Sequence, residues 1–76
     1  MEITLRELNP GMTARVTGLH CDAALKERLA DFGLVPGTEL SCCYRSPGGS
    51  VTALELRKTV LAIRTLDLGR IRAEVL

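Results

Sequence analysis

Four turn signals break this chain of 76 residues into short segments, and they constrain its fold more than any other feature. They lie at residues 9–11, 36–37, 47–49 and 57–58, and the first three contain a Pro-Gly pair. Proline presets one backbone angle and glycine reaches positive φ at little cost, so such pairs favour tight turns. The sequence therefore predicts short elements joined by tight turns.

Three segments alternate apolar and polar side chains over most of their length, which is the pattern of a strand with one buried face. In the second of them, Leu40, Cys42 and Tyr44 fall on the same face. Two further segments are bounded by turn signals, which favours strands there as well. Near the N-terminus, Leu5 and Leu8 fit either a single helical turn or an extended entry segment. The predicted strands are residues 12–19, 38–45, 51–56, 59–65 and 69–76.

One segment, residues 22–32, has the spacing of a helix. Leu25, Leu29 and Phe32 recur at i, i+4 and i+7, which puts them on one face. Asp22 can cap the first turn by accepting hydrogen bonds from free N–H groups. Gly33 can supply the left-handed residue that ends the helix. We expect Phe32, on the apolar face, to be used in the core.

Five short strands and one helix in so short a chain favour a small barrel, because closing a sheet removes its exposed edges. The length suits one domain, so residues 1–76 are predicted to form a single, mainly β domain with the helix after the first strand. Apolar burial and chain entropy nearly balance at this size, so a deep enclosed active site is not expected.

Composition excludes several classes of protein. Apolar residues make up 46% of the chain, which is too many for a disordered segment. No apolar run approaches the ~18 residues that span a bilayer, and no basic region followed by an apolar block marks a signal peptide. The net charge of +1 argues against a nucleic-acid binder. We therefore expect a cytoplasmic protein.

The chain offers few groups for catalysis. It has a single histidine, His20, and no nucleophile–base pattern stands out around it. The segment from Gly33 to Gly37 superficially resembles a glycine loop but lacks the Lys-Ser/Thr pair that would hold a phosphate and magnesium. The sequence thus predicts a protein that is not an enzyme and has no resident cofactor.

A metal site is the alternative that the sequence leaves open. His20 and Cys21 lie between a strand and the helix, and an imidazole with a thiolate suits Zn²⁺ or Fe²⁺. No further ligands are spaced to complete a tetrahedral site. Cys42 and Cys43 alternate along a strand, so Cys42 is expected in the core and Cys43 on the surface.

An apolar run follows the helix. Leu34, Val35 and Pro36 lie between Gly33 and Gly37 in a predicted loop. Bulky apolar residues in a loop either cover the end of a barrel or dock a partner, and both interpretations stay open here.

These segments together resemble the FeoA family, the small ferrous iron transport protein A. The most specific stretch is RLADFGLVPGT at residues 28–38, which is similar to the family's Arg-Leu segment ending in Pro-Gly. Lys58 replaces a glycine often found in the turn before the fourth barrel strand, and Leu68 replaces a small residue near the last turn. The other matching segments are Leu5-x-x-Leu8-x-x-Gly11, Ala14-x-Val16, Leu25-x-x-x-Leu29, Leu61–Arg64 and the tail from Ile71.

The resemblance implies an SH3-like β-barrel with one inserted helix, similar to the C-terminal domain of some iron-dependent repressors. It implies an accessory or regulatory protein of ferrous iron uptake that acts on the cytosolic, GTP-binding part of FeoB, a membrane transporter. The residues that we expect to contact this partner are Arg28, Leu34, Val35, Pro36 and Gly37. The alternative function is a small sensor or carrier that binds a transition metal through His20 and Cys21.

Overall fold

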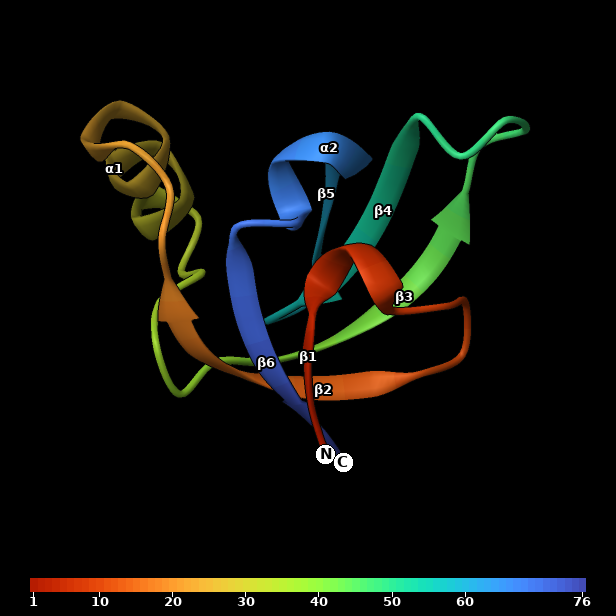
Figure 1. The fold of residues 1–76 in the computed structure, drawn as a ribbon, viewed down its shortest axis with the longest axis horizontal. Coiled ribbons are helices and arrows are strands. Elements are labelled where there is room, and N and C mark those ends of the chain that lie inside the picture. Colours follow the sequence, from red (N-terminus) through yellow and green to blue (C-terminus); the bar gives the residue numbers. More distant parts are fainter.

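The computed structural model describes all 76 residues of the chain. Six antiparallel strands form one bent sheet in the spatial order β1-β6-β2-β3-β4-β5 (Figure 1). The strands are β1 (Glu2–Thr4), β2 (Thr13–Leu19), β3 (Glu39–Arg45), β4 (Val51–Leu56), β5 (Thr59–Arg64) and β6 (Ile71–Val75). The helices are the 3-10 turn η1 (Leu5–Glu7), α1 (Ala23–Asp31) and the short α2 (Thr65–Leu68). The predicted mainly β architecture is confirmed, as are the five predicted strands to within two residues at each end.

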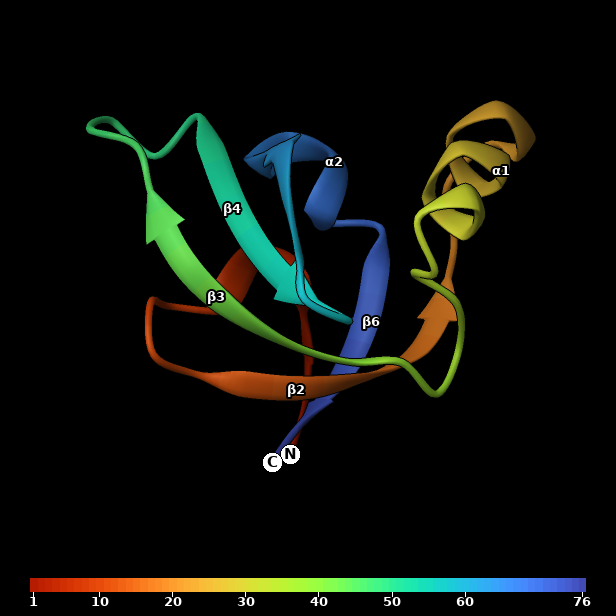
Figure 2. The same ribbon diagram turned by 180° about the vertical axis from the view of Figure 1, so that it is seen from behind.

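The sheet curls into a small barrel that stays open between its two edge strands. β1 pairs only with β6, and β5 pairs only with β4. η1 directly follows β1 in the chain, α2 directly follows β5, and these two short helices pack against each other at the seam (Figures 1 and 2). Arg45 of β3 fastens η1 by donating hydrogen bonds from Nη2 to the carbonyl oxygens of Arg6 at 2.9 Å and Leu8 at 2.7 Å.

Two elements were not predicted. β1 has three residues, too few for alternation to show, and its pairing with β6 is reinforced by an ion pair between Glu2 and Arg72 at 2.6 Å. α2 begins at Thr65, the last residue of the fourth predicted strand. Its first residue, Thr65, is buried, and its hydroxyl lies 2.7 Å from that of Thr52 on β4, so a polar pair in the interior fixes the change from strand to helix.

One cluster of buried apolar side chains fills the barrel. The burial of Cys42 and the exposure of Cys43 confirm the predicted alternation at these two positions. Every buried side-chain nitrogen or oxygen has a hydrogen-bond partner. The cluster consists of Ile3, Leu5, Leu8, Ala14, Val16, Leu19, Leu29, Leu34, Leu40, Cys42, Leu54, Leu56, Leu61, Leu68, Ile71 and Ala73.

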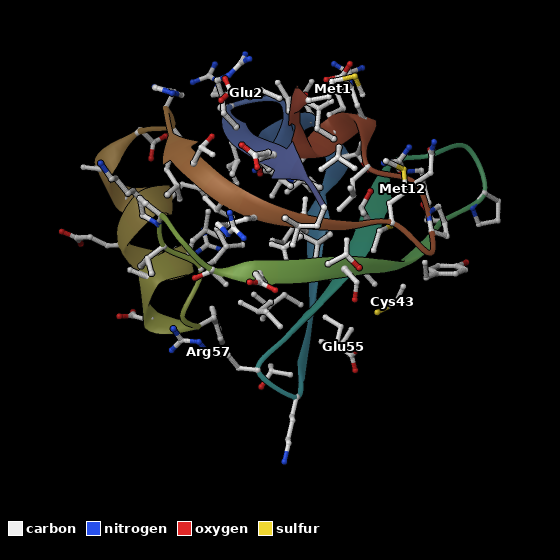
Figure 3. The ribbon with its side chains drawn as sticks, turned by 90° about the horizontal axis from the view of Figure 1, so that it is seen from below. Met1, Glu2, Met12, Cys43, Glu55 and Arg57 are labelled. Atoms are coloured by element: carbon white, nitrogen blue, oxygen red, sulfur yellow. The ribbon has the colours of Figure 1, made fainter.

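A β-bulge changes the alternation in β3. Cys42 pairs with Leu54 and Tyr44 with Ala53, so Cys43 is the extra residue on the bulged strand. Cys43 points away from the sheet (Figure 3), and Tyr44 is 54% exposed. The predicted placement of Tyr44 on the face of Cys42 is therefore wrong, because the alternation rule assumes a ladder without an inserted residue.

The turn between β4 and β5 uses two residues in the left-handed region, Arg57 at φ 50° and Lys58 at φ 65°. Two-residue hairpin turns of this kind favour Asn-Gly, since glycine has no Cβ and the short polar side chain of asparagine tolerates the left-handed region, in which longer side chains are strained. We expect Lys58→Gly to raise the free energy of unfolding by about 0.5 to 1 kcal/mol, the relieved strain less the entropy that glycine adds to the unfolded chain. Urea denaturation of Lys58→Gly beside Lys58→Ala tests this, and equal stability of the two variants would contradict it.

α1 stands away from the sheet at one side of the barrel (Figures 1 and 2). The predicted cap is confirmed, with Asp22 Oδ1 accepting a hydrogen bond from the N–H of Leu25 at 2.8 Å. Leu29 is buried and Leu25 half-buried, but Phe32 is 54% exposed. The expectation that Phe32 is used in the core is wrong, because Phe32 is the residue that ends the helix, at φ −94° and ψ 2°.

Candidate functional site

A groove of about 200 Å³ separates α1 from β5 and α2. It exists because α1 reaches the core mainly through Leu29, which leaves the rest of its inner face open. Five of the eight lining residues are apolar. The groove is lined by Leu25, Arg28, Leu29 and Phe32 from α1 and its C-terminal end, and by Leu61, Ile63, Arg64 and Asp67 from β5 and α2.

The rim of the groove carries more positive than negative charge. Arg64 is paired with Asp67, with 3.2 Å between Nη2 and Oδ2. Arg28 forms no ion pair within the chain, so its guanidinium is free to pair with another molecule. The acidic residues of α1, Glu27 and Asp31, do not line the groove. An apolar floor beside an unpaired arginine suits a partner segment with an apolar side chain and a nearby carboxylate.

The loop after α1 is held by its own hydrogen bonds. Thr38 Oγ1 donates to the carbonyl of Gly33 at 2.7 Å and accepts from the N–H of Val35 at 3.2 Å. Gly37, at φ 94°, donates its N–H to the carbonyl of Val16 at 2.7 Å. The side chain of Arg57 lies against Gly33, near the C-terminal end of α1 (Figure 3), and its Nη1 atom is 3.2 Å from where a Cβ on Gly33 would be.

The structure separates the five residues that the sequence suggested for partner contact. Leu34 is fully buried in the core, so its side chain covers the barrel. The prediction that this side chain contacts a partner is therefore corrected. Val35 is half-buried, while Pro36 and Gly37 are exposed on the loop. Only Arg28 lines the groove.

Most groove residues were not predicted as site residues. The sequence places Phe32 in the core, and the β5 residues offer no signal beyond that of a short predicted strand. The helical spacing of Leu25, Arg28 and Phe32 would have indicated one face, but not that this face stays open.

His20 and Cys21 lie together at the start of the loop before α1. His20 is exposed, with Nε2 3.1 Å from the position of a Cβ on Gly18, and Cys21 is half-buried. No group of three His, Cys, Asp or Glu side chains gathers there or elsewhere in the chain. A structural zinc site uses four ligands, so these two donors do not fit one within a single molecule.

No helix in this structure has the length and apolar character needed to cross a membrane.

Comparisons with known proteins agree with the fold. The chain is similar to the FeoA protein of Chlorobium tepidum, with 30% identity, a TM-score of 0.93, and coverage of 97% of this chain and 70% of that one. It is similar to Stenotrophomonas maltophilia FeoA, with 28% identity, a TM-score of 0.81, and coverage of 95% and 89%. That protein was solved with zinc and is described as a prokaryotic SH3 domain protein, which agrees with the SH3-like fold expected here.

A manganese-dependent transcriptional repressor shares the fold alone, with 14% identity and a TM-score of 0.87 over 99% of this chain and 42% of the repressor. A search of curated proteins found no match to the sequence. The FeoA domain model, in contrast, matches residues 3–75, almost the whole chain. The chain therefore belongs to the FeoA family.

Proposed function

We propose that this protein is a non-catalytic, cytoplasmic accessory protein of ferrous iron uptake that docks on the cytosolic, GTP-binding part of a FeoB-type transporter. The observation that carries this proposal is the match of the FeoA domain over residues 3–75. The Stenotrophomonas maltophilia relative is described as a candidate activating factor of bacterial ferrous iron transport, which supports the same role here.

The groove between α1 and β5 is the surface that suits docking best. Phe32 is exposed beside Leu25 and Ile63, and aromatic side chains next to arginines are typical of residues that dominate binding energy. Arg28 adds a charge that has no partner within the chain. Pro36 and Gly37 are exposed on the loop that follows α1, so we propose Val35–Gly37 as a flanking contact.

Capture of the transporter from solubilised membranes of iron-starved source cells tests the proposal. We expect the tagged wild-type protein to recover a large GTP-binding membrane transporter. Phe32→Ala should lower recovery about tenfold or more, because an aromatic anchor contributes roughly 2 kcal/mol or more to an interface. Tyr44→Ala is the matched control, since Tyr44 is also 54% exposed but lies on β3, outside the groove.

Each outcome of this capture experiment separates one part of the proposal. Recovery of the transporter by wild type and by Tyr44→Ala, but not by Phe32→Ala, would support docking through the groove. Equal recovery by all three proteins would remove the groove as the docking surface. Failure of the wild type to recover any transporter would contradict the proposed function itself.

The metal-binding alternative has less support. The zinc in the Stenotrophomonas maltophilia structure is the observation that favours it. His20 and Cys21 offer only two donors here, so a complete zinc site at this position needs ligands from a second molecule.

A further inference from the structure

The two edges of the sheet differ in how well they are protected against pairing with another strand. β1 is three residues long and carries Glu2, and short, charged strands make poor templates. β5 is six residues long, its register with β4 is unbroken, and only its last residue, Arg64, is charged. A long, regular and apolar edge of this kind is a pairing site unless something covers it.

The hydrogen bonds of β5 show which of its backbone groups face outward. The N–H of Thr65 donates to the carbonyl of Ser50 at 2.9 Å, which identifies Ser50 and Thr65 as a hydrogen-bonded pair. Such pairs alternate along an antiparallel ladder, so Ile63, Leu61 and Thr59 bond to β4. The N–H groups of Val60, Ala62 and Arg64 therefore point away from β4, where no strand pairs with them. Val60 is 58% exposed, which agrees with an open edge.

The groove lies beside this edge and limits what can bind there. β4 pairs with β5 on one side only, and the groove is lined by residues of both β5 and α1. Its volume of about 200 Å³ is below the ~300–1,000 Å³ of a typical small-molecule pocket. A space of this size suits the side chain of a bound peptide, and the unpaired Arg28 at its rim favours a carboxylate close to that side chain.

We infer that β5 is a strand-acceptor edge: an extended segment of the partner pairs with Val60, Ala62 and Arg64, inserts one apolar side chain between Phe32 and Ile63, and places an acidic residue at Arg28. This inference rests on the proposed function, because the segment belongs to the docking partner. It adds the mode of recognition, main-chain pairing at β5, and the chemistry of the segment, apolar with acidic flanks.

The test uses a peptide probe, so it does not depend on the transporter. The probe is a short synthetic peptide of alternating valine and threonine with a central leucine and an aspartate at each end; a second peptide has lysine in place of aspartate. We expect the acidic peptide to shift the backbone amide signals of Val60, Ala62 and Arg64 saturably and to slow their hydrogen exchange. The lysine peptide should bind about tenfold more weakly, because its positive charge is repelled by that of Arg28.

Ala62→Pro tests main-chain pairing directly. Proline removes an N–H that points outward, so the ladder with β4 keeps all its bonds and the fold should survive. The loss of one main-chain bond and the bulk of the ring should weaken binding of the acidic peptide about tenfold or more. Ala62→Thr, which keeps the N–H and suits a strand, is the matched control and should bind like the wild type.

The outcomes distinguish this inference from the proposed function. Capture of the transporter by Ala62→Pro at the wild-type level, or a peptide that leaves the β5 amides unchanged, would overturn the strand-acceptor edge while leaving the accessory role intact. Binding of the peptide at β5 without capture of any transporter would support the edge and contradict the proposed partner. Self-association that Ala62→Pro abolishes would identify a second copy as the occupant and overturn the inference.

Discussion

Leu34→Asp is expected to unfold the domain. Leu34 is fully buried within the core cluster, and truncating such a leucine to alanine costs about 2–5 kcal/mol. Aspartate adds the cost of burying a carboxylate that has no cationic partner. A chain of 76 residues has a total stability of about 4–11 kcal/mol, so the combined loss exceeds or nearly exceeds it. Circular dichroism and the dispersion of amide proton signals would show the loss of structure.

Val35→Asp is the matched control for this prediction. Val35 is the next residue along the chain and is only half-buried, so a carboxylate there can reach water. We expect this variant to stay folded with a modest loss of stability. A folded Leu34→Asp protein with native amide dispersion would contradict the placement of Leu34 in the core. Because Leu34→Asp changes the fold, it cannot report on docking, although the sequence pattern alone would make it an attractive docking variant.

Arg28→Glu is expected to weaken partner binding strongly while leaving the domain folded. Arg28 lines the groove and pairs with no acid of its own chain, so reversing its charge breaks no internal ion pair. It turns an attraction for an acidic segment into a repulsion, and close charge pairs at interfaces contribute about 1.5 kcal/mol or more. We expect the affinity for the transporter's cytosolic part to fall about tenfold or more.

Lys26→Glu controls for the change of charge itself. Lys26 is exposed on the same helix but does not line the groove. The two variants carry the same net charge, so general electrostatic attraction changes equally in both. Arg28→Glu also places an acid in the last turn of α1, which costs the helix about 0.3–1 kcal/mol, so the melting temperature is measured alongside. Equal loss of affinity in both variants would contradict a specific contact at Arg28.

The strands and α1 could be predicted because their signals are local. Alternation and the turn pairs fix where β2 to β6 lie, and Asp22 and Gly33 mark the ends of the helical region. β1 could not be predicted because three residues are too few to show a period. It is held by pairing with β6, a contact distant in sequence. The bulge at Cys43 could not be predicted for a related reason, since an inserted residue can be recognised only when the partner strand is known.

The groove could not be predicted because it depends on how far α1 stands from the sheet. The period of the helix shows that Leu25, Leu29 and Phe32 share a face, but it does not show how much of that face is buried. Leu29 alone reaches the core fully, and Phe32 stays exposed at the end of the helix. Leu34, in a loop that could either cover the barrel or dock a partner, turned out to cover it.

Titration of the purified protein with the isolated cytosolic, GTP-binding part of the transporter, followed by amide NMR, tests docking through the groove and β5 in one experiment. We expect saturable binding, with signal changes centred on Arg28, Phe32 and the β5 residues 60–64, and little change on the exposed bulge at Cys43 and Tyr44. Absence of saturable binding, or changes confined to residues outside the groove and β5, would contradict this expectation.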